Sequence, residues 1–289
     1  MSSQIFTKDR PAKILAIMAH PDDFEFNAGG LFAQLRSHYG EGVILRVINT
    51  STGASGHHLL NADEAFQRRL AEAKASAALI GAEADCLSQL DGSHVQGQVL
   101  VSRNLIGGIW NAIRSFGADY VFCPPVVSDP LAGIHVDHEE TARAVRLVGY
   151  QLGVPQAYPT TGHAPLREYR SPLIILTDDV YSSESNFDVA VDIGNEFGTK
   201  VSMAECHVSQ VFEWLPFNQG KKPPTRESFA VNFRERHTRI NARFAQPDDS
   251  PREYYRISNW GRRLQPHDLD LLFPEEKVIS PGLRKRFPG

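Results

Sequence analysis

The chain has 289 residues, of which 42% are apolar and 22% are charged, a composition that is typical of a globular protein and excludes a disordered one. The formal net charge of -4 at pH 7 gives no support to nucleic-acid or polyanion binding, because such proteins usually carry a basic excess. The length allows one large α/β domain or two small ones.

Strand and helix signals alternate along the first half of the chain. The expected strands are Ile14–Ala19, Val43–Asn49, Asp85–Leu90 and Asp119–Cys123, and the expected helices are Asn27–His38, Glu64–Ile80, Val101–Phe116 and Glu139–Leu152. Short continuous apolar runs are typical of parallel strands that are buried on both faces. This order predicts an α/β fold with a doubly wound, mostly parallel sheet, which binds ligands at the carboxyl ends of its strands.

The second half is less regular. Two strands (Leu173–Thr177, Phe187–Ile193) and two helices (Glu196–Val211, Phe229–Phe244) are expected there. Residues 155–172 are rich in proline and predict an irregular excursion. The tail from Gln246 shows little periodicity. Because no clear linker divides the chain, we expect a single domain over residues 1–289, with an irregular C-terminal elaboration from about residue 216.

Cysteine usage and the N-terminus indicate a compartment. Cys86, Cys123 and Cys206 are widely spaced and predict neither a disulfide framework nor a metal knuckle, so a reducing environment is expected. Residues 1–13 lack the apolar core of a secretory signal, and no apolar run approaches the roughly 20 residues that a membrane span needs. We therefore expect a cytoplasmic protein without membrane contact. Any bound metal should have nitrogen and oxygen ligands.

The first chemically rich cluster is Ala19-His20-Pro21-Asp22-Asp23, directly after the first buried strand. A parallel sheet places such a turn at the rim where ligands bind. There, His20 and Asp23 can share one cation, and Asp22 can face a water molecule on it. The alternative is that one of the acids caps a helix and that His20 is a surface turn residue.

The second cluster is His135-Val136-Asp137-His138, between the strand at 119–123 and the next helix. At a spacing of three, His135 and His138 project to the same side of a helix. Asp137 can fix the tautomer of a histidine by accepting its second N–H. The alternative is an Asp137 cap beside two exposed histidines. Together, however, the two clusters offer three ligands and one open position, which is the pattern of a catalytic zinc site.

These two motifs resemble those of the zinc-dependent N-acetylglucosaminyl deacetylases, the PIG-L or LmbE-like family. The similarity covers about residues 12–215 and includes five further segments: Phe26–Gly30, the loop Gly53–His58, the arginine-rich opening of the second helix, Asp91-Gly92 and Cys206–Gln210. It implies a Rossmann-like fold with helices on both faces of the sheet. It also implies one Zn²⁺ per chain and hydrolysis of an N-acetyl group on a small-molecule amino sugar.

The resemblance also implies roles for individual residues. The zinc ligands would be His20, Asp23 and His138. Asp22 would act as the general base. His135 would stabilise the oxyanion or protonate the leaving amine, with Asp137 orienting it. Val136 stands where the family often has proline, which affects the loop and not the ligands.

Arg69 and Asp91 are the expected substrate-binding residues, because relatives hold sugar hydroxyls at these positions. The alternatives are an i,i+3 pair between Arg69 and Glu72, and a turn aspartate at Asp91. Paired loop histidines such as His57 and His58 are more often exposed to solvent.

Residues further along the chain carry weaker signals. His207 and Gln210 either complete the site or serve the structure. The arginines from Arg226 to Arg263 favour local ion pairs over a phosphate site.

Three other functions compete with an amidohydrolase. The same metal fold serves hydratases of unsaturated carboxylic acids, but such relatives lose the proline and first aspartate of the first motif, whereas Pro21 and Asp22 are present here. A non-catalytic binding module predicts a damaged ligand set, and the set is intact. A nucleotide-binding protein is disfavoured because no glycine-rich phosphate loop follows the first strand. The state of assembly, monomer or homo-oligomer, stays open.

Overall fold

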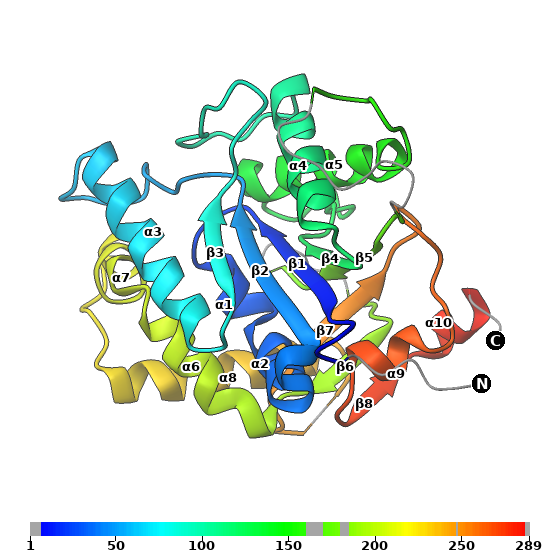
Figure 1. Cartoon of the computed structure of the whole chain (residues 1–289). Helices are drawn as coiled ribbons and strands as arrows, with labels where there is room; N and C mark the ends of the chain where they lie inside the picture. The colour runs from blue at the N-terminus through cyan, green and yellow to red at the C-terminus, as the bar shows by residue number, and fades with distance from the viewer. Residues whose placement is uncertain (1–6, 160–169, 180–184, 247, 287–289) are drawn as a thin grey trace.

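The computed structural model describes residues 7–159, 170–179, 185–246 and 248–286. In this part of the chain eight strands form one sheet, in the order β3-β2-β1-β4-β5-β7-β6-β8 (Figure 1). The strands are β1 Ala12–Met18, β2 Val43–Asn49, β3 Glu83–Cys86, β4 Tyr120–Cys123, β5 Leu173–Thr177, β6 Val189–Asp192, β7 Arg252–Ile257 and β8 Lys277–Ile279. Strands β1 to β5 pair in parallel, and β7, β6 and β8 extend the sheet in antiparallel pairs. The predicted mostly parallel α/β fold is confirmed.

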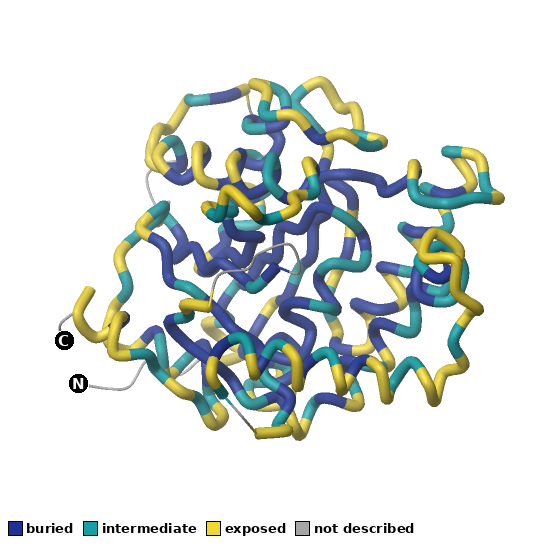
Figure 2. Tube along the Cα trace, turned by 180° about the vertical axis from the view of Figure 1, so that it is seen from behind, coloured by how far each residue is buried: buried dark blue, intermediate teal, exposed yellow. Residues whose placement is uncertain are grey.

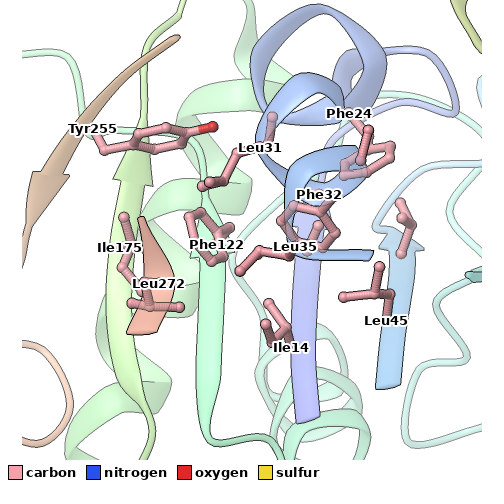
Figure 3. Close-up of a cluster of buried hydrophobic side chains, with 14 of the residues drawn as sticks. Ile14, Phe24, Leu31, Phe32, Leu35, Leu45, Phe122, Ile175, Tyr255 and Leu272 are labelled. Atoms are coloured by element: carbon pink, nitrogen blue, oxygen red, sulfur yellow. The ribbon is translucent and has the colours of Figure 1, made fainter. Parts of the chain in front are cut away.

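Helices cover both faces of this sheet. They are α1 Asp23–Asn27, α2 Gly29–Tyr39, α3 Ala62–Ala78, α4 Arg103–Phe116, α5 Val136–Gln151, α6 Phe197–Glu205, α7 Leu215–Asn218, α8 Arg226–Arg243, α9 Asp268–Leu272 and α10 Pro281–Arg286, with 3₁₀ turns at Gly40–Gly42 and Gly194–Glu196 and a π-helix at Ser209–Trp214. Successive side chains of β1 point to opposite faces. Ile14 and Ala16 therefore pack with α2 in one core, and Leu15 and Ile17 pack with α4 and α5 in the other. Figure 3 shows the first of these cores.

Local sequence signals explain where the main helices begin and end. Asn61 and Glu64 form a reciprocal capping box at the start of α3. The Ser102 side chain accepts a hydrogen bond from the Leu105 N–H at the start of α4. That helix ends at Gly117, whose φ of 70° lies in the left-handed region that favours glycine.

Two expectations for the second half are wrong. The helix expected over residues 196–211 is broken, because α6 ends at Glu205 and a π-helix follows at Ser209–Trp214. The tail after Gln246 is not without regular structure, since β7 lies inside the sheet between β5 and β6. Both faces of β7 are covered and it buries Glu253, so it lacks the apolar alternation of a half-buried strand. Of the proline-rich stretch 155–172, residues 160–169 lie outside the described part of the chain.

The sheet order identifies where a ligand should bind. Strand β1 lies between β2 and β4, so the connections after β1 and after β4 diverge to opposite sides. In doubly wound folds the crevice at such a switch point, outside the carboxyl ends of the strands, is the usual binding site. Buried chain is concentrated in the strands, and exposed chain on the outer helices and loops (Figure 2). Within the described ranges, no helix combines the length and apolar character needed to cross a membrane.

Candidate metal centre

The three predicted ligands converge at the carboxyl ends of two adjacent strands. His20 follows β1, Asp23 opens α1, and His138 lies in the first turn of α5, after β4. Asp23 Oδ2 lies 3.4 Å from His20 Nδ1 and 3.3 Å from His138 Nε2. These three donor atoms all lie within 4.8 Å of one another. Residues more than a hundred positions apart are thus brought into one group by the pairing of β1 with β4.

The outer nitrogen of each histidine is held by a buried carboxylate. His20 Nε2 lies 3.0 Å from Asp137 Oδ2, and His138 Nδ1 lies 2.7 Å from Asp179 Oδ2. Asp137 is itself fixed, since its Oδ1 accepts a hydrogen bond of 2.6 Å from the Val99 N–H. Metal-binding histidines usually have such carboxylate partners, which fix the tautomer and turn the other nitrogen towards the metal.

The electrostatics of the group favour bound positive charge. Burial raises the pKa of the Asp23 carboxyl, but His138 and His20 outweigh this effect and hold that pKa well below its usual range. Burial opposes protonation of His138, yet Asp23 and Asp179 raise its pKa to about 11. The carboxylates therefore stabilise a positive charge at this place. A divalent cation satisfies the same field, and two imidazoles with one carboxylate suit zinc.

His135 lies beside this group, but its partner is not the expected one. Its ring centroid is 4.7 Å from that of His20 and 5.2 Å from that of His138. The Asp137 carboxylate, expected to orient His135, bonds instead to His20. His135 Nδ1 accepts a hydrogen bond from the Asp137 backbone N–H, which places the ring hydrogen of neutral His135 on Nε2. Burial lowers the pKa of His135, and the His20 and His138 rings lower it further.

Arg69 holds the expected general base. Its Nη2 donates to Asp22 Oδ1 over 2.6 Å and its Nη1 donates to the Gly53 carbonyl over 2.8 Å. Its side chain is only 4% exposed. Gly53 has a φ of +66°, and a Cβ there would lie 2.2 Å from Arg69 Nη1, so the glycine is required on both counts. The expected substrate residue is therefore packed against the protein and positions Asp22.

The alternative ion pair between Arg69 and Glu72 does not form. Glu72 instead accepts hydrogen bonds from the N–H and hydroxyl of Ser209, and from Arg68. Arg68 in turn donates to both carboxylate oxygens of Glu213. These contacts fasten α3 to the π-helix.

Asp91 lies at an exposed turn, and its described contacts do not include His20, Asp23 and His138, the candidate metal-binding group. Its Oδ1 accepts hydrogen bonds from the Ser93 N–H and hydroxyl, and its Oδ2 accepts one from Asn104. The hydrogen bonds from Ser93 lower the pKa of Asp91. These are the contacts of a turn aspartate, the alternative considered for this position.

The paired loop histidines are ordered, so their expected exposure to solvent is wrong. The His57 side chain is 2% exposed and its Nε2 lies 2.9 Å from Glu213 Oε2. His58 stacks on Phe217 with ring centroids 3.8 Å apart. Both histidines therefore attach the loop after β2 to the π-helix and α7.

His207 and Gln210 have structural partners behind the metal-binding group. His207 is fully buried, with its Nε2 3.0 Å from Glu25 Oε1 on α1. Gln210 Nε2 donates to the Gly56 carbonyl over 2.9 Å. The two side chains support α1 and the loop that contains Gly53.

Asp179 is a further residue of the site that was not predicted from the sequence. Its side chain is 1% exposed and holds His138 from the end of β5. A signal was available, because Asp178-Asp179 directly follows an apolar strand, as the first cluster does after β1. The C-terminal arginines form the expected local ion pairs: Arg226 with Glu205, Arg243 with Asp178, Arg252 with Asp248, and Arg262 with Asp268.

Solved structures share this fold. N,N'-diacetylchitobiose deacetylase from Pyrococcus horikoshii aligns with a TM-score of 0.63 and 21% identity, over 90% of this chain and 88% of its own. GalB, the 4-carboxy-2-hydroxymuconate hydratase of Pseudomonas putida, aligns with a TM-score of 0.60 and 15% identity, over 88% and 98%. The A40926 pseudoaglycone deacetylase Dbv21 aligns with a TM-score of 0.55 and 17% identity, over 86% and 98%. At these identities the likeness shows the fold alone.

Sequence comparison identifies a family domain in the first half of the chain. No curated protein matches the chain by sequence. Residues 15–148 match the family PIG-L, which is described as GlcNAc-PI de-N-acetylase. The matched stretch contains both motifs, from His20 to His138. Residues 15–148 are therefore a PIG-L domain, as the two motifs indicated.

Proposed function

We propose that the protein is a zinc-dependent hydrolase that removes an N-acetyl group from an amino sugar or an amino-sugar conjugate. The observation that carries the proposal is the convergence of His20 Nδ1, Asp23 Oδ2 and His138 Nε2, with Asp22 held beside them by Arg69. The description of the PIG-L family supports the reaction, as does the shared fold with two deacetylases.

Zinc fits the donor set, with His20, Asp23 and His138 as its ligands. When bound, it supplies Lewis acidity, which makes an amide carbonyl more electrophilic and a water molecule more acidic. The protein contributes the carboxylates that orient both histidines, Asp137 and Asp179. Among the described residues this group contains three ligands, which leaves room for substrate.

Asp22 and His135 divide the proton chemistry. Asp22 takes a proton from the attacking water, while Arg69 fixes its Oδ1. His135 has its hydrogen on Nε2 and donates from there to the developing oxyanion. The leaving amine then receives the proton that Asp22 took from the water, because loss of the Nε2 hydrogen would leave neutral His135 as an imidazolate anion. Neither residue needs to move far, because both are held by hydrogen bonds within the fold.

A hydratase of an unsaturated carboxylic acid is the second candidate, because the GalB hydratase has the same fold. Hydration adds water across a carbon–carbon double bond and releases no amine. Pro21 and Asp22 are both present in this chain, which favours hydrolysis.

The test is an amine-release assay on a panel of N-acetyl sugars that includes N-acetylglucosamine, diacetylchitobiose and aryl conjugates. We expect amine release from at least one sugar, its loss after chelation, and its return when zinc is added. The His138→Ala protein is the matched control and should neither bind zinc tightly nor release amine. Hydration of a hydroxymuconate-type acid, with every N-acetyl sugar intact, would falsify the deacetylase proposal and establish the second candidate.

A further inference from the structure

A residue with an unusual backbone conformation lies in the loop between β3 and α4 (Figure 1). Gln98 has a φ of 55°, in the left-handed region that residues other than glycine seldom adopt. Among the described residues, Ala245 is the one other such case. Ala245 directly follows the C-cap of α8, where a left-handed residue commonly ends a helix. No helix begins or ends at Gln98, so its conformation has a different cause.

The peptide that joins Gln98 to the next residue contacts a carboxylate of the site. The N–H of Val99 donates to Asp137 Oδ1 over 2.6 Å. The other oxygen of Asp137, Oδ2, lies 3.0 Å from Nε2 of the expected ligand His20. A carboxylate in that place keeps the histidine hydrogen on Nε2 and leaves Nδ1 free for a cation. The backbone at Gln98 is therefore part of the support of a metal ligand.

The neighbouring chain fixes this peptide on both sides. Before it, the Thr52 N–H donates to the Val95 carbonyl over 2.7 Å, and the Thr52 hydroxyl donates to the Gln96 carbonyl over 3.3 Å. After it, the Val99 side chain is fully buried. A strained conformation persists only where its surroundings hold it, and such conformations concentrate at functional sites. Here the strain at Gln98 directs a donor at the support of His20.

The side chain of Gln98 does not explain why a strained residue occupies this place. It is exposed, and in the described part of the chain it makes no hydrogen bond, ion pair or ring contact. A substitution at this position therefore changes the backbone preference and removes no side-chain contact. The property of Gln98 that can act on the site is its conformation.

We propose that Gln98 is a positioning residue, whose left-handed conformation directs the Val99 N–H at Asp137 and so orients His20 for zinc. The inference rests on the metal centre of the proposed function, and it is independent of the reaction and the substrate. If the backbone at this residue relaxes, Asp137 loses its donor and His20 loses a fixed partner. Zinc affinity should then follow the tolerance of the residue for a positive φ, whatever its size or polarity.

The test is a set of substitutions that differ in this tolerance. Glycine adopts a positive φ freely and asparagine more readily than most residues, whereas a β-branched side chain opposes it. We expect Gln98→Gly and Gln98→Asn to bind zinc as tightly as the wild type. Gln98→Val should bind zinc roughly tenfold more weakly, because the left-handed conformation is unfavourable for valine. Competition with a chromophoric chelator measures these affinities without any assay of activity.

Ala245 provides the matched control, because it is exposed and has a φ of 54°. Ala245→Val should lose about as much unfolding free energy as Gln98→Val does, but it should keep the zinc affinity of the wild type. Equal zinc affinity in Gln98→Val and wild type would overturn the proposal. So would binding by Gln98→Gly and Gln98→Asn that is as weak as that of Gln98→Val, since the side chain would then be responsible. A wild-type protein that binds no zinc would refute the metal centre itself and this inference with it.

Discussion

Two groups of buried charged residues lie on the same sheet, and they are satisfied in opposite ways. Around Glu253 each carboxylate oxygen accepts two hydrogen bonds: Oε1 from the Gly30 N–H and Lys200, and Oε2 from the Leu31 N–H and Tyr255. Figure 3 shows Tyr255 next to Leu31 in the core. In the metal-binding group, by contrast, His20, Asp23 and His138 direct three donor atoms at one point.

This difference in hydrogen bonding distinguishes the structural network around Glu253 from the candidate metal-binding site. Glu253 is saturated by the protein, and it fixes the start of α2 to β7 because a carboxylate at a helix N-terminus also complements the helix dipole. The metal-binding group is saturated only on its outer side, by Asp137 and Asp179. A charged group whose hydrogen bonds all come from the chain stabilises the fold. A group that needs an added cation to satisfy its inner donor atoms is suited to catalysis.

The largest effect is expected from breaking the saturated network. Glu253→Ala leaves the fully buried Lys200 without its partner, and loss of one member of a buried ion pair costs about 3–5 kcal/mol of unfolding free energy. Denaturant titration measures this loss. The double variant Glu253→Leu/Lys200→Met removes both charges and should be more stable than Glu253→Ala. If Glu253→Ala is as stable as wild type, the network contributes no net stability.

The next largest effect is expected at Asp22. The variant Asp22→Asn keeps the shape of the side chain but cannot accept the proton of water. Turnover should fall by a factor on the order of a hundred or more. Bound zinc, measured by elemental analysis, should be unchanged because Asp22 is not in the ligand set. Normal turnover in this variant would remove Asp22 from the role of base.

A smaller effect is expected when a carboxylate behind a ligand is removed. Asp179→Asn keeps a hydrogen-bond partner for His138 but loses the charge, and we expect zinc affinity to fall roughly 10- to 100-fold. Competition with a chromophoric chelator measures this without any assay of activity. Asp178→Asn is the matched control, since Asp178 pairs with Arg243 and not with His138. Equal zinc affinity in the two variants would contradict a supporting role for Asp179.

Arg69 gives a still smaller effect that distinguishes positioning from substrate binding. Arg69→Gln should lower kcat about tenfold through a misplaced Asp22 and leave KM nearly unchanged, because loss of an interaction that acts only in the transition state lowers kcat. Arg68→Gln breaks an ion pair one residue earlier on α3 and should leave both constants unchanged. A raised KM with normal kcat in Arg69→Gln would instead indicate a direct sugar contact.

The sequence predicted the features that depend on neighbouring residues and on the order of strands and helices. It did not predict the features that depend on side-chain contacts between distant parts of the chain. His20 and Asp23 share one turn, and His138 follows a neighbouring strand, so the alternation of strands and helices was enough to bring them together. Asp137 lies between His135 and His138 in the sequence, but its carboxylate contacts His20. This contact joins residues that are 117 positions apart in the chain. Strand β7 was missed because it is buried on both faces and contains Glu253, whose burial makes sense only with Lys200 beside it.

Two buried histidines, His138 and His237, extend the comparison to the effect of pH. His138 faces two acids, whereas the buried His237 faces Lys200 and Arg236, and its Nδ1 bonds to the Arg252 carbonyl. Burial, aided by those cations, lowers the pKa of His237 to about 2. Between the usual pKa of about 6.5 and that value, only the unfolded chain takes up this proton. The contribution of His237 to the free energy of unfolding is therefore fully present above pH 6.5. As the pH falls below that value, the contribution decreases by at most about 1.4 kcal/mol per pH unit.

The measurement is the unfolding free energy of wild type and His237→Asn between pH 7 and pH 4. Asparagine retains a donor for the Arg252 carbonyl but cannot be protonated in this range. The difference in stability between the two proteins should therefore shrink steadily as the pH falls below 6.5, while the carboxylates common to both cancel from it. Parallel curves for the two proteins would show that His237 takes up its proton in the folded state. In that case the buried cations around His237 lower its pKa much less than the carboxylates around His138 raise the pKa of that residue.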